Sequence, residues 1–217
     1  MLVSGITIGI LEIVLYLFVS FTIRDNWIQF TTINLFTYCW LTMTVLTGFW
    51  EFIYRTNYNS IKNTAKLYIT NNEHTWTNQY SLDYILPWKV SEIFYTEYAA
   101  YADREYMSDK NIWSRTIEGS HEWCCGLFAL FALLSKYYHN EKLYLICISI
   151  SMGTQFMNSL LYSINYFIQV KDPHNPNYDS PKFPLGFALL NRAFFWVNLC
   201  WLLFPFIVLS SLIIHNL

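Results

Sequence analysis

Apolar segments long enough to cross a membrane constrain the fold of this 217-residue chain more than any other feature. A transmembrane helix needs about 20 consecutive, predominantly apolar residues. Such segments lie at about residues 3–23, 28–54, 117–135, 143–170 and 185–215. We therefore predict an all-α polytopic membrane protein, with a single domain of five transmembrane helices over residues 1–217.

The composition supports a membrane location. Only 13% of the residues are charged and 54% are hydrophobic, whereas about a quarter of the residues in a soluble domain are charged. The charges gather between Glu51 and Glu118 and become sparse on either side, as in a protein that crosses the membrane several times. A net charge of −2 without a basic patch argues against nucleic-acid binding.

The first apolar segment differs from a secretory signal, because it lacks a basic beginning and a small-residue cleavage site and contains Glu12. A long polar segment follows the second apolar segment, at about residues 55–112. Its second half mixes aromatic, small and charged residues, and we predict a helix that packs on the membrane face. Five spans place the N-terminus, this segment and the 171–184 loop on one side, which the positive-inside rule assigns to the cytoplasm.

A cluster of ionisable residues, Glu118, His121 and Glu122, lies where the third apolar segment begins. The spacing i, i+3, i+4 places the three side chains on one helical face. A carboxylate beside an imidazole in a low-dielectric site suits an acid/base shuttle. The alternative is that these groups lie at the headgroup level and bond to water and the helix N-terminus. Glu12 and Arg192 are expected to form a structural pair or to reach the membrane surface.

Other side chains suggest less specific roles. Most tryptophans and tyrosines are expected in interfacial belts. Trp201 lies deeper, where its ring could hold a cation, and Asn198 lies on the same helical face. The five cysteines fall inside apolar segments without a CxxC pair or a zinc-like spacing, so they are expected to be buried hydrophobes and no metal site is predicted.

Four motifs follow one another in this chain: EYAAYADREY (97–106), TIEGSHEWCCG (116–126), TQFMNSLLY (154–162) and VNLCWLLFP (197–205). In this order they resemble the EXPERA domain of the emopamil-binding protein family over about residues 40–210. EYAAYADREY is similar to the EYA…DSRY segment that precedes the third span of the family. TIEGSHEWCCG (116–126) is similar to the stretch that follows, with an early glutamate and a later glycine. TQFMNSLLY (154–162) resembles the Q…LY motif, and VNLCWLLFP (197–205) resembles N-x-x-W…P.

The resemblance implies a cavity between the helices that is open to lipid and holds a sterol. The family includes the sterol Δ8–Δ7 isomerase, which protonates one end of a double bond and deprotonates the other side through a carbocation, with no cofactor. Carried over to this chain, the catalytic residues are Glu51, Glu118 and His121. The substrate-binding residues are Thr47, Glu122, Asn198, Trp201, Gln155 and Tyr162. The structural residues of the EYAAYADREY motif are Glu97, Tyr98, Asp103 and Tyr106.

Several positions depart from the family pattern. The family histidine one turn before the first glutamate is Thr47 here, and the threonine one turn after the second glutamate is His121. The remaining departures are Arg104, Glu105 and Leu127. Either histidine and threonine have exchanged sides of one cavity, or catalysis has been lost.

Two hypotheses follow. The first is a sterol isomerase in which Thr47, Glu51, Glu118, His121, Asn198 and Trp201 line one cavity. The second is a non-catalytic protein, either an accessory subunit of a larger membrane complex or a lipid- or amine-binding protein. The expected partners are membrane lipids, a sterol-like ligand, and a second copy of the chain or a host complex. The resemblance implies the endoplasmic reticulum, with the mitochondrial inner membrane as the alternative.

Overall fold

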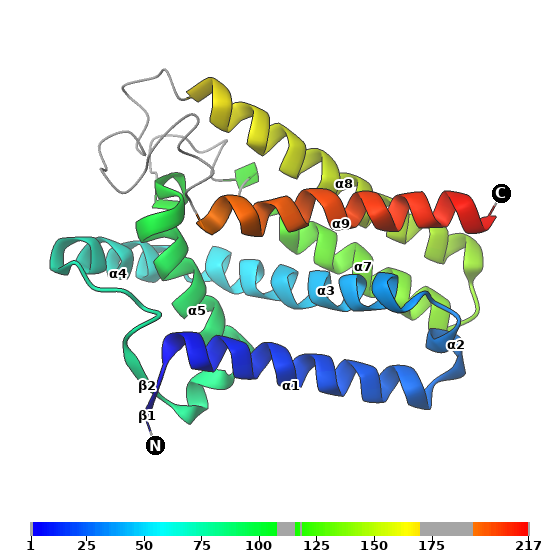
Figure 1. The fold of residues 1–217 in the computed structure, drawn as a ribbon, viewed down its shortest axis with the longest axis horizontal. Coiled ribbons are helices and arrows are strands. Elements are labelled where there is room, and N and C mark those ends of the chain that lie inside the picture. The colour runs from blue at the N-terminus through cyan, green and yellow to red at the C-terminus, as the bar shows by residue number, and fades with distance from the viewer. Residues whose placement is uncertain (1, 108–115, 118, 170–192, 217) are drawn as a thin grey trace.

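A computed structural model describes residues 2–107, 116, 117, 119–169 and 193–216. The described chain is mostly helical, and its long helices run side by side along the longest axis of the molecule (Figure 1). These helices are α1 (Gly5–Asn26), α3 (Leu35–Thr56), α7 (His121–Tyr137), α8 (Glu141–Gln169) and α9 (Ala193–Asn216). Each of them overlaps one predicted apolar segment. Residues 185–192 of the last segment lie outside the described residues.

Three of these helices, α1, α8 and α9, are long and apolar enough to cross a membrane. The outer face of α1 exposes apolar side chains such as Ile10, Val14 and Phe18, whereas Glu12 on the same helix is buried. Apolar side chains outside and polar ones inside are expected of a helix that contacts lipid. The chain therefore fits an integral membrane protein. The prediction of five spans is not confirmed, because α3 and α7 do not meet the same criterion.

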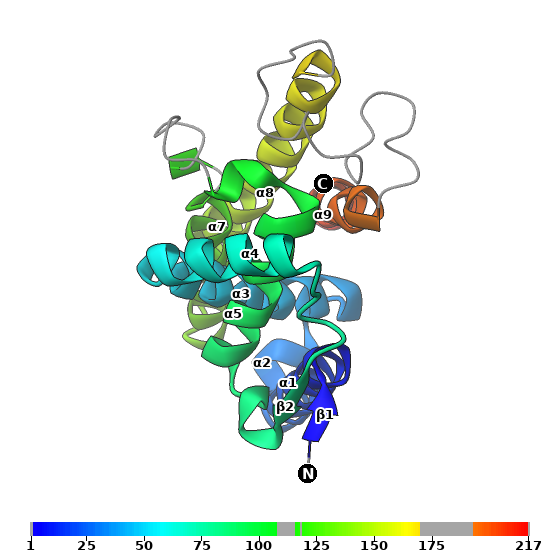
Figure 2. The same cartoon turned by 90° about the vertical axis from the view of Figure 1, so that its left-hand side faces the viewer.

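Helix α3 lies between α1 and the pair α8–α9 in both views (Figures 1 and 2). Its N-terminus is capped by Asn34, whose side-chain oxygen accepts hydrogen bonds from the N–H groups of Phe36 and Thr37. Asparagine is a preferred residue at this position. The cap separates α3 from the short helix α2 (Ile28–Thr31), so the prediction of one continuous helix over residues 28–54 is wrong.

The polar segment after α3 folds over one end of the bundle (Figure 1). Its elements are α4 (Tyr58–Asn71), β2 (Gln79–Ser81), a 3₁₀ turn (Leu82–Ile85), α5 (Pro87–Glu97), a π-helical turn (Tyr98–Ala102) and a 3₁₀ turn (Arg104–Met107). The predicted helix in the second half of this segment is confirmed by α5. It packs across α3, where the Ser91 hydroxyl donates to the carbonyl oxygen of Trp50 at 2.5 Å.

A short β-ribbon departs from the all-α prediction. Strand β1 (Leu2–Ser4) pairs antiparallel with β2, and Val3 lies opposite Tyr80. The N–H of Gly5 then donates to the carbonyl oxygen of Asn78 at 3.0 Å, which satisfies one free amide in the first turn of α1. The ribbon therefore fixes the start of α1 to the segment that follows α4.

Helices α3 and α7 touch through two glycines, Gly48 and Gly126. A Cβ atom built on Gly48 would lie 2.8 Å from the Cα of Gly126 and 2.7 Å from the carbonyl oxygen of Glu122. Both obstacles are backbone atoms, so they cannot turn aside as a flexible side chain can. Small residues allow two helices to approach this closely.

The substitution Gly48→Ala is expected to lower the free energy of unfolding by about 2 kcal/mol, because the new methyl group must push α3 away from α7. Denaturant titration of the protein in detergent micelles measures this change. Gly153→Ala on α8 is the matched control, since nothing lies within 4 Å of its added Cβ. The control should be neutral or stabilise by up to about 1 kcal/mol. Equal effects of the two substitutions would contradict the close contact.

Candidate functional site

A cavity of about 90 Å³ lies at the end of the bundle that α5 covers. Helices α3, α5, α7 and α9 contribute to its wall. The residues assigned to a cavity from the sequence and found in this wall are Thr47, Glu51, His121, Glu122, Asn198 and Trp201. The rest of the wall is aromatic or apolar and consists of Trp50, Phe94, Tyr95, Tyr98, Tyr106 and Val197. The structure thus gathers the titratable side chains of α3 and α7 with the polar and aromatic residues of α9.

Glu51 connects α3 to the beginning of α7. Its side chain is completely buried, and Oε2 accepts a hydrogen bond of 2.8 Å from the backbone N–H of Trp123. This N–H belongs to the first turn of α7, where amides have no acceptor within the helix. The other oxygen, Oε1, lies 3.5 Å from Nδ1 of His121. Glu51 therefore caps a helix and faces an imidazole at the same time.

The His121 imidazole lines the cavity beside Glu51. Its Nδ1 lies within reach of two acceptors, Oε1 of Glu51 at 3.5 Å and the carbonyl oxygen of Ile117 at 3.3 Å. A proton on Nδ1 can be directed to either acceptor. Small movements of the ring decide which acceptor takes it, and this freedom suits a group that transfers protons.

Glu122 is held by neutral hydrogen-bond donors. The Thr47 hydroxyl lies 2.6 Å from Oε1, and the amide nitrogen of Gln155 lies 2.9 Å from both carboxylate oxygens. The amide oxygen of Gln155 in turn accepts a hydrogen bond of 2.8 Å from the indole N–H of Trp40. This buried chain of contacts joins α3, α7 and α8. It holds the Glu122 carboxylate in one orientation at the cavity wall.

The aromatic wall of the cavity comes largely from α5 and the π-helical turn. Tyr95 on α5 packs against the rings of Phe94 and Tyr106. Burial, and then the charges of Glu51 and Glu122, raise the pKa of Tyr95 well above its usual range. The phenol therefore remains protonated at neutral pH. It is a neutral group beside two carboxylates.

Contacts on α9 orient the remaining cavity residues. The ring of Trp201 meets the ring of Trp40 edge-on, with centroids 5.3 Å apart. The amide nitrogen of Asn198 lies 3.3 Å from the hydroxyl oxygen of Tyr98. An aromatic ring and carboxylates around one cavity favour a ligand with a positive centre.

Some residues assigned from the sequence either fall outside the described residues or do not line the cavity. Glu118 and Arg192 lie outside the described residues. Gln155 and Tyr162 were assigned to substrate binding, but neither lines the cavity. Gln155 orients Glu122 from behind, and the Tyr162 hydroxyl donates to Oδ2 of Asp103 at 2.7 Å.

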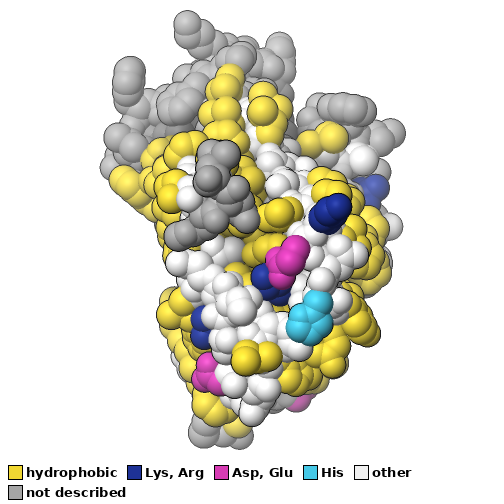
Figure 3. Space-filling model, turned by 90° about the vertical axis from the view of Figure 1, so that its right-hand side faces the viewer, with side chains coloured by type: hydrophobic (Ala, Val, Ile, Leu, Met, Phe, Trp, Pro, Cys, Tyr) yellow, Lys and Arg dark blue, Asp and Glu magenta, His cyan; other side chains and the backbone are white. Residues whose placement is uncertain are grey.

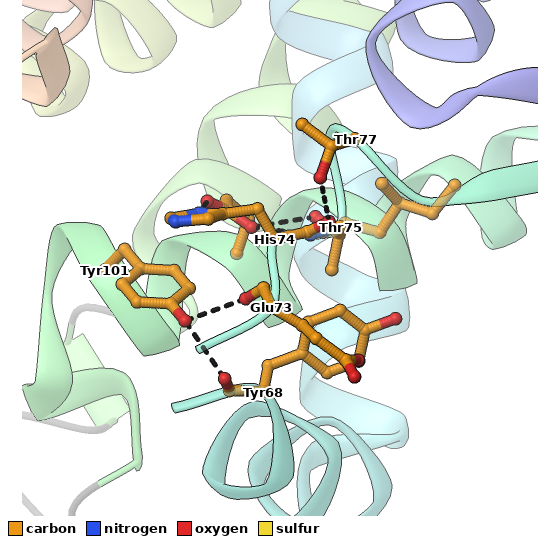
Figure 4. Close-up of polar contacts among 8 residues, drawn as sticks. Tyr68, Glu73, His74, Thr75, Thr77 and Tyr101 are labelled. Carbon is orange, nitrogen blue, oxygen red and sulfur yellow. Dashed lines mark hydrogen bonds and ion pairs between the residues drawn. The ribbon is translucent and has the colours of Figure 1, made fainter. Parts of the chain in front are cut away.

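The EYAAYADREY segment connects separate parts of the fold. Glu97 accepts a hydrogen bond of 2.8 Å from the backbone N–H of Thr75, and its other oxygen lies 2.6 Å from Nδ1 of His74. Figure 4 shows the loop that contains His74 and Thr75, together with Tyr101. The Tyr101 ring stacks on the His74 ring, and its hydroxyl donates to the carbonyl oxygens of Tyr68 and Glu73. The other members of the motif, Tyr98, Asp103 and Tyr106, contact Asn198, Tyr162 and Tyr54, respectively. These contacts fit the structural role assigned to the motif.

Glu12 is buried, which argues against one of its two expected roles. It does not reach the membrane surface, because it is only 4% exposed and its Oε1 accepts a hydrogen bond of 3.1 Å from the indole N–H of Trp50. The expected pairing with Arg192 falls outside the described residues. Sequence reasoning missed Trp50 as a cavity residue, since tryptophans were assigned mainly to the membrane interface. Glu12 could have indicated this contact, because an acid within an apolar segment needs a hydrogen-bond donor from a neighbouring helix, and here Trp50 is that donor.

The groups around the cavity define what it can do. Within the described residues, no three His, Cys, Asp or Glu side chains gather in a way that could hold a metal ion. The side chains that are present can bind a cation, donate hydrogen bonds and transfer protons. Comparisons with models of known protein families, with curated proteins and with solved structures found no match to this chain.

Proposed function

We propose that all five long helices cross the membrane. Helix α3 has 22 residues, which correspond to about 33 Å, and a bilayer core is about 30 Å thick. It packs among other helices, where threonine and glutamate side chains avoid contact with lipid. Helix α7 packs against both α3 and α8, which favours placing it in the same layer.

We propose further that the protein is a sterol isomerase of the emopamil-binding type, which moves a double bond within an apolar polycyclic lipid. The observation that carries this proposal is the His121–Glu51 pair, with 3.5 Å between nitrogen and oxygen, in the wall of a cavity between the helices. Trp201 and Asn198 line the same cavity, which supports the resemblance found in the sequence motifs.

The reaction needs a proton donor, a proton acceptor and a stabilised carbocation. In our proposal the His121 imidazolium adds a proton to one carbon of the double bond, and the neighbouring carbon becomes positive. The Glu51 carboxylate and the Trp201 ring stabilise this charge. A proton then leaves the carbon on the far side of the cation, and the sequence resemblance assigns Glu118 as its acceptor. The product is an isomer of the substrate.

The size of the cavity favours a second candidate function. About 90 Å³ is well below the roughly 300–1,000 Å³ of pockets for drug-sized ligands. A sterol therefore enters only if the aromatic wall moves. The second candidate is a non-catalytic protein of this fold, which serves as an accessory subunit of a membrane complex or binds a smaller lipid or amine.

Incubation of the purified protein with a Δ8 sterol in deuterated buffer separates these functions. The isomerase should release the Δ7 isomer with one added deuterium, because the proton that it donates exchanges with solvent. Mass spectrometry of the extracted sterol measures both changes. Bound sterol without any product would favour a binding protein. Neither binding nor product, together with co-purification of a large complex in mild detergent, would favour an accessory subunit.

The cellular location and the partners are proposed on the same resemblance. We propose the membrane of the endoplasmic reticulum, with the mitochondrial inner membrane as the alternative. The protein acts there with membrane lipids, as a homodimer or within a host complex. Fractionation of cells that produce the tagged protein distinguishes the two compartments.

A further inference from the structure

A second, larger cavity of about 540 Å³ lies at the end of the bundle opposite the candidate site. It is formed where α1, α3, α7, α8 and α9 meet, and Figure 3 looks at this end of the molecule. Basic and acidic side chains lie close together near the middle of this face, with hydrophobic side chains along its flanks (Figure 3). The residues that line the cavity are Arg24, Thr31, Thr32, Ile33, Asn34, Leu35, Thr37, Lys136, Glu141, Tyr144, Leu145, Ser211 and Leu212.

Arg24 is the first cation of this cavity. One of its terminal nitrogens lies 3.2 Å from the carbonyl oxygen of Ile33 and 3.4 Å from that of Thr31. Its Nε is buried and has no hydrogen-bond partner among the described residues. The ion pair with Asp25 is long, at 3.8 Å, and the Asp25 side chain is 75% exposed, so water screens it. Among the described residues, the guanidinium in this wall is thus neutralised only weakly by a carboxylate.

Lys136 is the second cation. Its Nζ lies 2.7 and 2.9 Å from the two oxygens of Glu141. The Lys136 side chain is 14% exposed and the Glu141 side chain is 59% exposed, so this pair lies at the mouth of the cavity. Arg24, Lys136 and Glu141 are the charged side chains among the lining residues. Their charges sum to one positive charge, which favours an anion.

The neutral part of the wall favours an amphipathic ligand. Hydroxyl groups of Thr31, Thr32 and Ser211 each donate to the carbonyl oxygen three residues earlier in the chain. Their oxygens can therefore still accept hydrogen bonds from hydroxyl groups of a ligand. Leu35 lines the same cavity and is 53% exposed, so the rim continues into the apolar outer surface.

We propose that this cavity binds the phosphate headgroup of an anionic glycerophospholipid, with its acyl chains along the apolar surface beyond Leu35. A guanidinium and an ammonium group are the side chains that bind phosphate most strongly. Basic pockets between membrane helices suit anionic headgroups. The volume of about 540 Å³ lies within the range of known ligand sites, about 300–1,000 Å³. The site is independent of the proposed isomerase chemistry.

Native mass spectrometry of the full chain in mild detergent, with phosphatidylglycerol and phosphatidylcholine added in equal amounts, tests this proposal. The unsubstituted protein should retain phosphatidylglycerol about tenfold better than phosphatidylcholine. Arg24→Gln and Lys136→Gln should each reduce this preference about tenfold, the effect of losing one hydrogen bond to a charged group. Lys142→Gln is the matched control, because Lys142 is exposed near the same end and does not line the cavity.

Glu141→Gln should act in the opposite direction and raise the retention of phosphatidylglycerol several-fold, because it releases Lys136 from its carboxylate partner. A variant that merely destabilises the protein cannot produce such an increase. If Arg24→Gln does not fold, the proposal is tested by the expected loss of phosphatidylglycerol preference in Lys136→Gln and the expected gain in Glu141→Gln. Equal retention of the two lipids, or equal behaviour of Lys136→Gln and Lys142→Gln, would overturn the proposal.

A competition experiment distinguishes a lipid ligand from a soluble phosphate compound. Inorganic phosphate or glycerol 3-phosphate at millimolar concentration should leave the bound phosphatidylglycerol in place, because neither carries acyl chains to occupy the apolar rim. Complete displacement by either of them would show that the site takes free phosphate compounds, and the assignment to a lipid would then be wrong.

Discussion

Replacing His121 with alanine is expected to lower the turnover of a Δ8 sterol about a hundredfold, the effect of losing one acid or base group. The imidazole lies 3.5 Å from Glu51 in the cavity wall. Its removal therefore takes away the proposed proton donor and leaves the carboxylate in place. Binding of the sterol should change little. Rates of Δ7 product formation, compared with sterol binding by the same preparation, measure the two effects separately.

His139 provides the matched control for this substitution. It lies in the turn between α7 and α8, away from the cavity, and has a positive φ of 59°. Asparagine tolerates this conformation, so His139→Asn removes an imidazole without backbone strain. The control should keep full turnover. If His121→Ala also kept full turnover, or lost sterol binding to the same extent as turnover, His121 would not be the proton donor.

Replacing Gln155 with leucine is expected to lower the free energy of unfolding by about 3 kcal/mol, the cost of breaking a buried polar network around a charge. The substitution removes the amide that lies 2.9 Å from both oxygens of Glu122. It also leaves the indole N–H of Trp40 without its acceptor at 2.8 Å. Denaturant titration in micelles measures the loss.

Gln79→Leu is the control for the Gln155 substitution, because Gln79 is exposed on β2. It should change the free energy of unfolding by less than about 0.5 kcal/mol. Similar losses for the two leucine variants would mean that the network around Glu122 contributes little to stability.

Much of the helical framework could be predicted from the sequence, because the length and the apolar character of a segment are local properties. Helix α3 shows where this approach fails. Its interior position lets it carry threonine and glutamate, so its apolarity is weaker than that of α1 or α9. Its start at Leu35 depends on the cap by Asn34, a single residue inside an otherwise continuous apolar run.

Part of the cavity lining could be predicted from the sequence, but the hydrogen-bond contacts of the site could not. The motif resemblance placed Glu51, His121 and Trp201 around one cavity, and the structure brings these residues together. Their hydrogen-bond partners depend on which helices become neighbours. The cap that Glu51 provides to α7 and the support that Gln155 provides to Glu122 are contacts between distant segments. No local pattern indicates them, and the same holds for the β1–β2 ribbon.

The contact between Gly48 and Gly126 also determines which parts of α3 and α7 a tilt between the two helices would displace. Glu51 follows Gly48 by three residues, and Glu122 precedes Gly126 by four, so both lie about one helical turn, or 5.4 Å, from this contact. Consider a tilt of about 10° between α3 and α7 about this contact. It moves either carboxylate by only about 1 Å, whereas a helix end about 15 Å away moves by almost 3 Å. Such a tilt would leave the spacing of the two carboxylates almost unchanged, whereas the largest movement would occur at Leu35 and Tyr137, at the opposite end of the bundle.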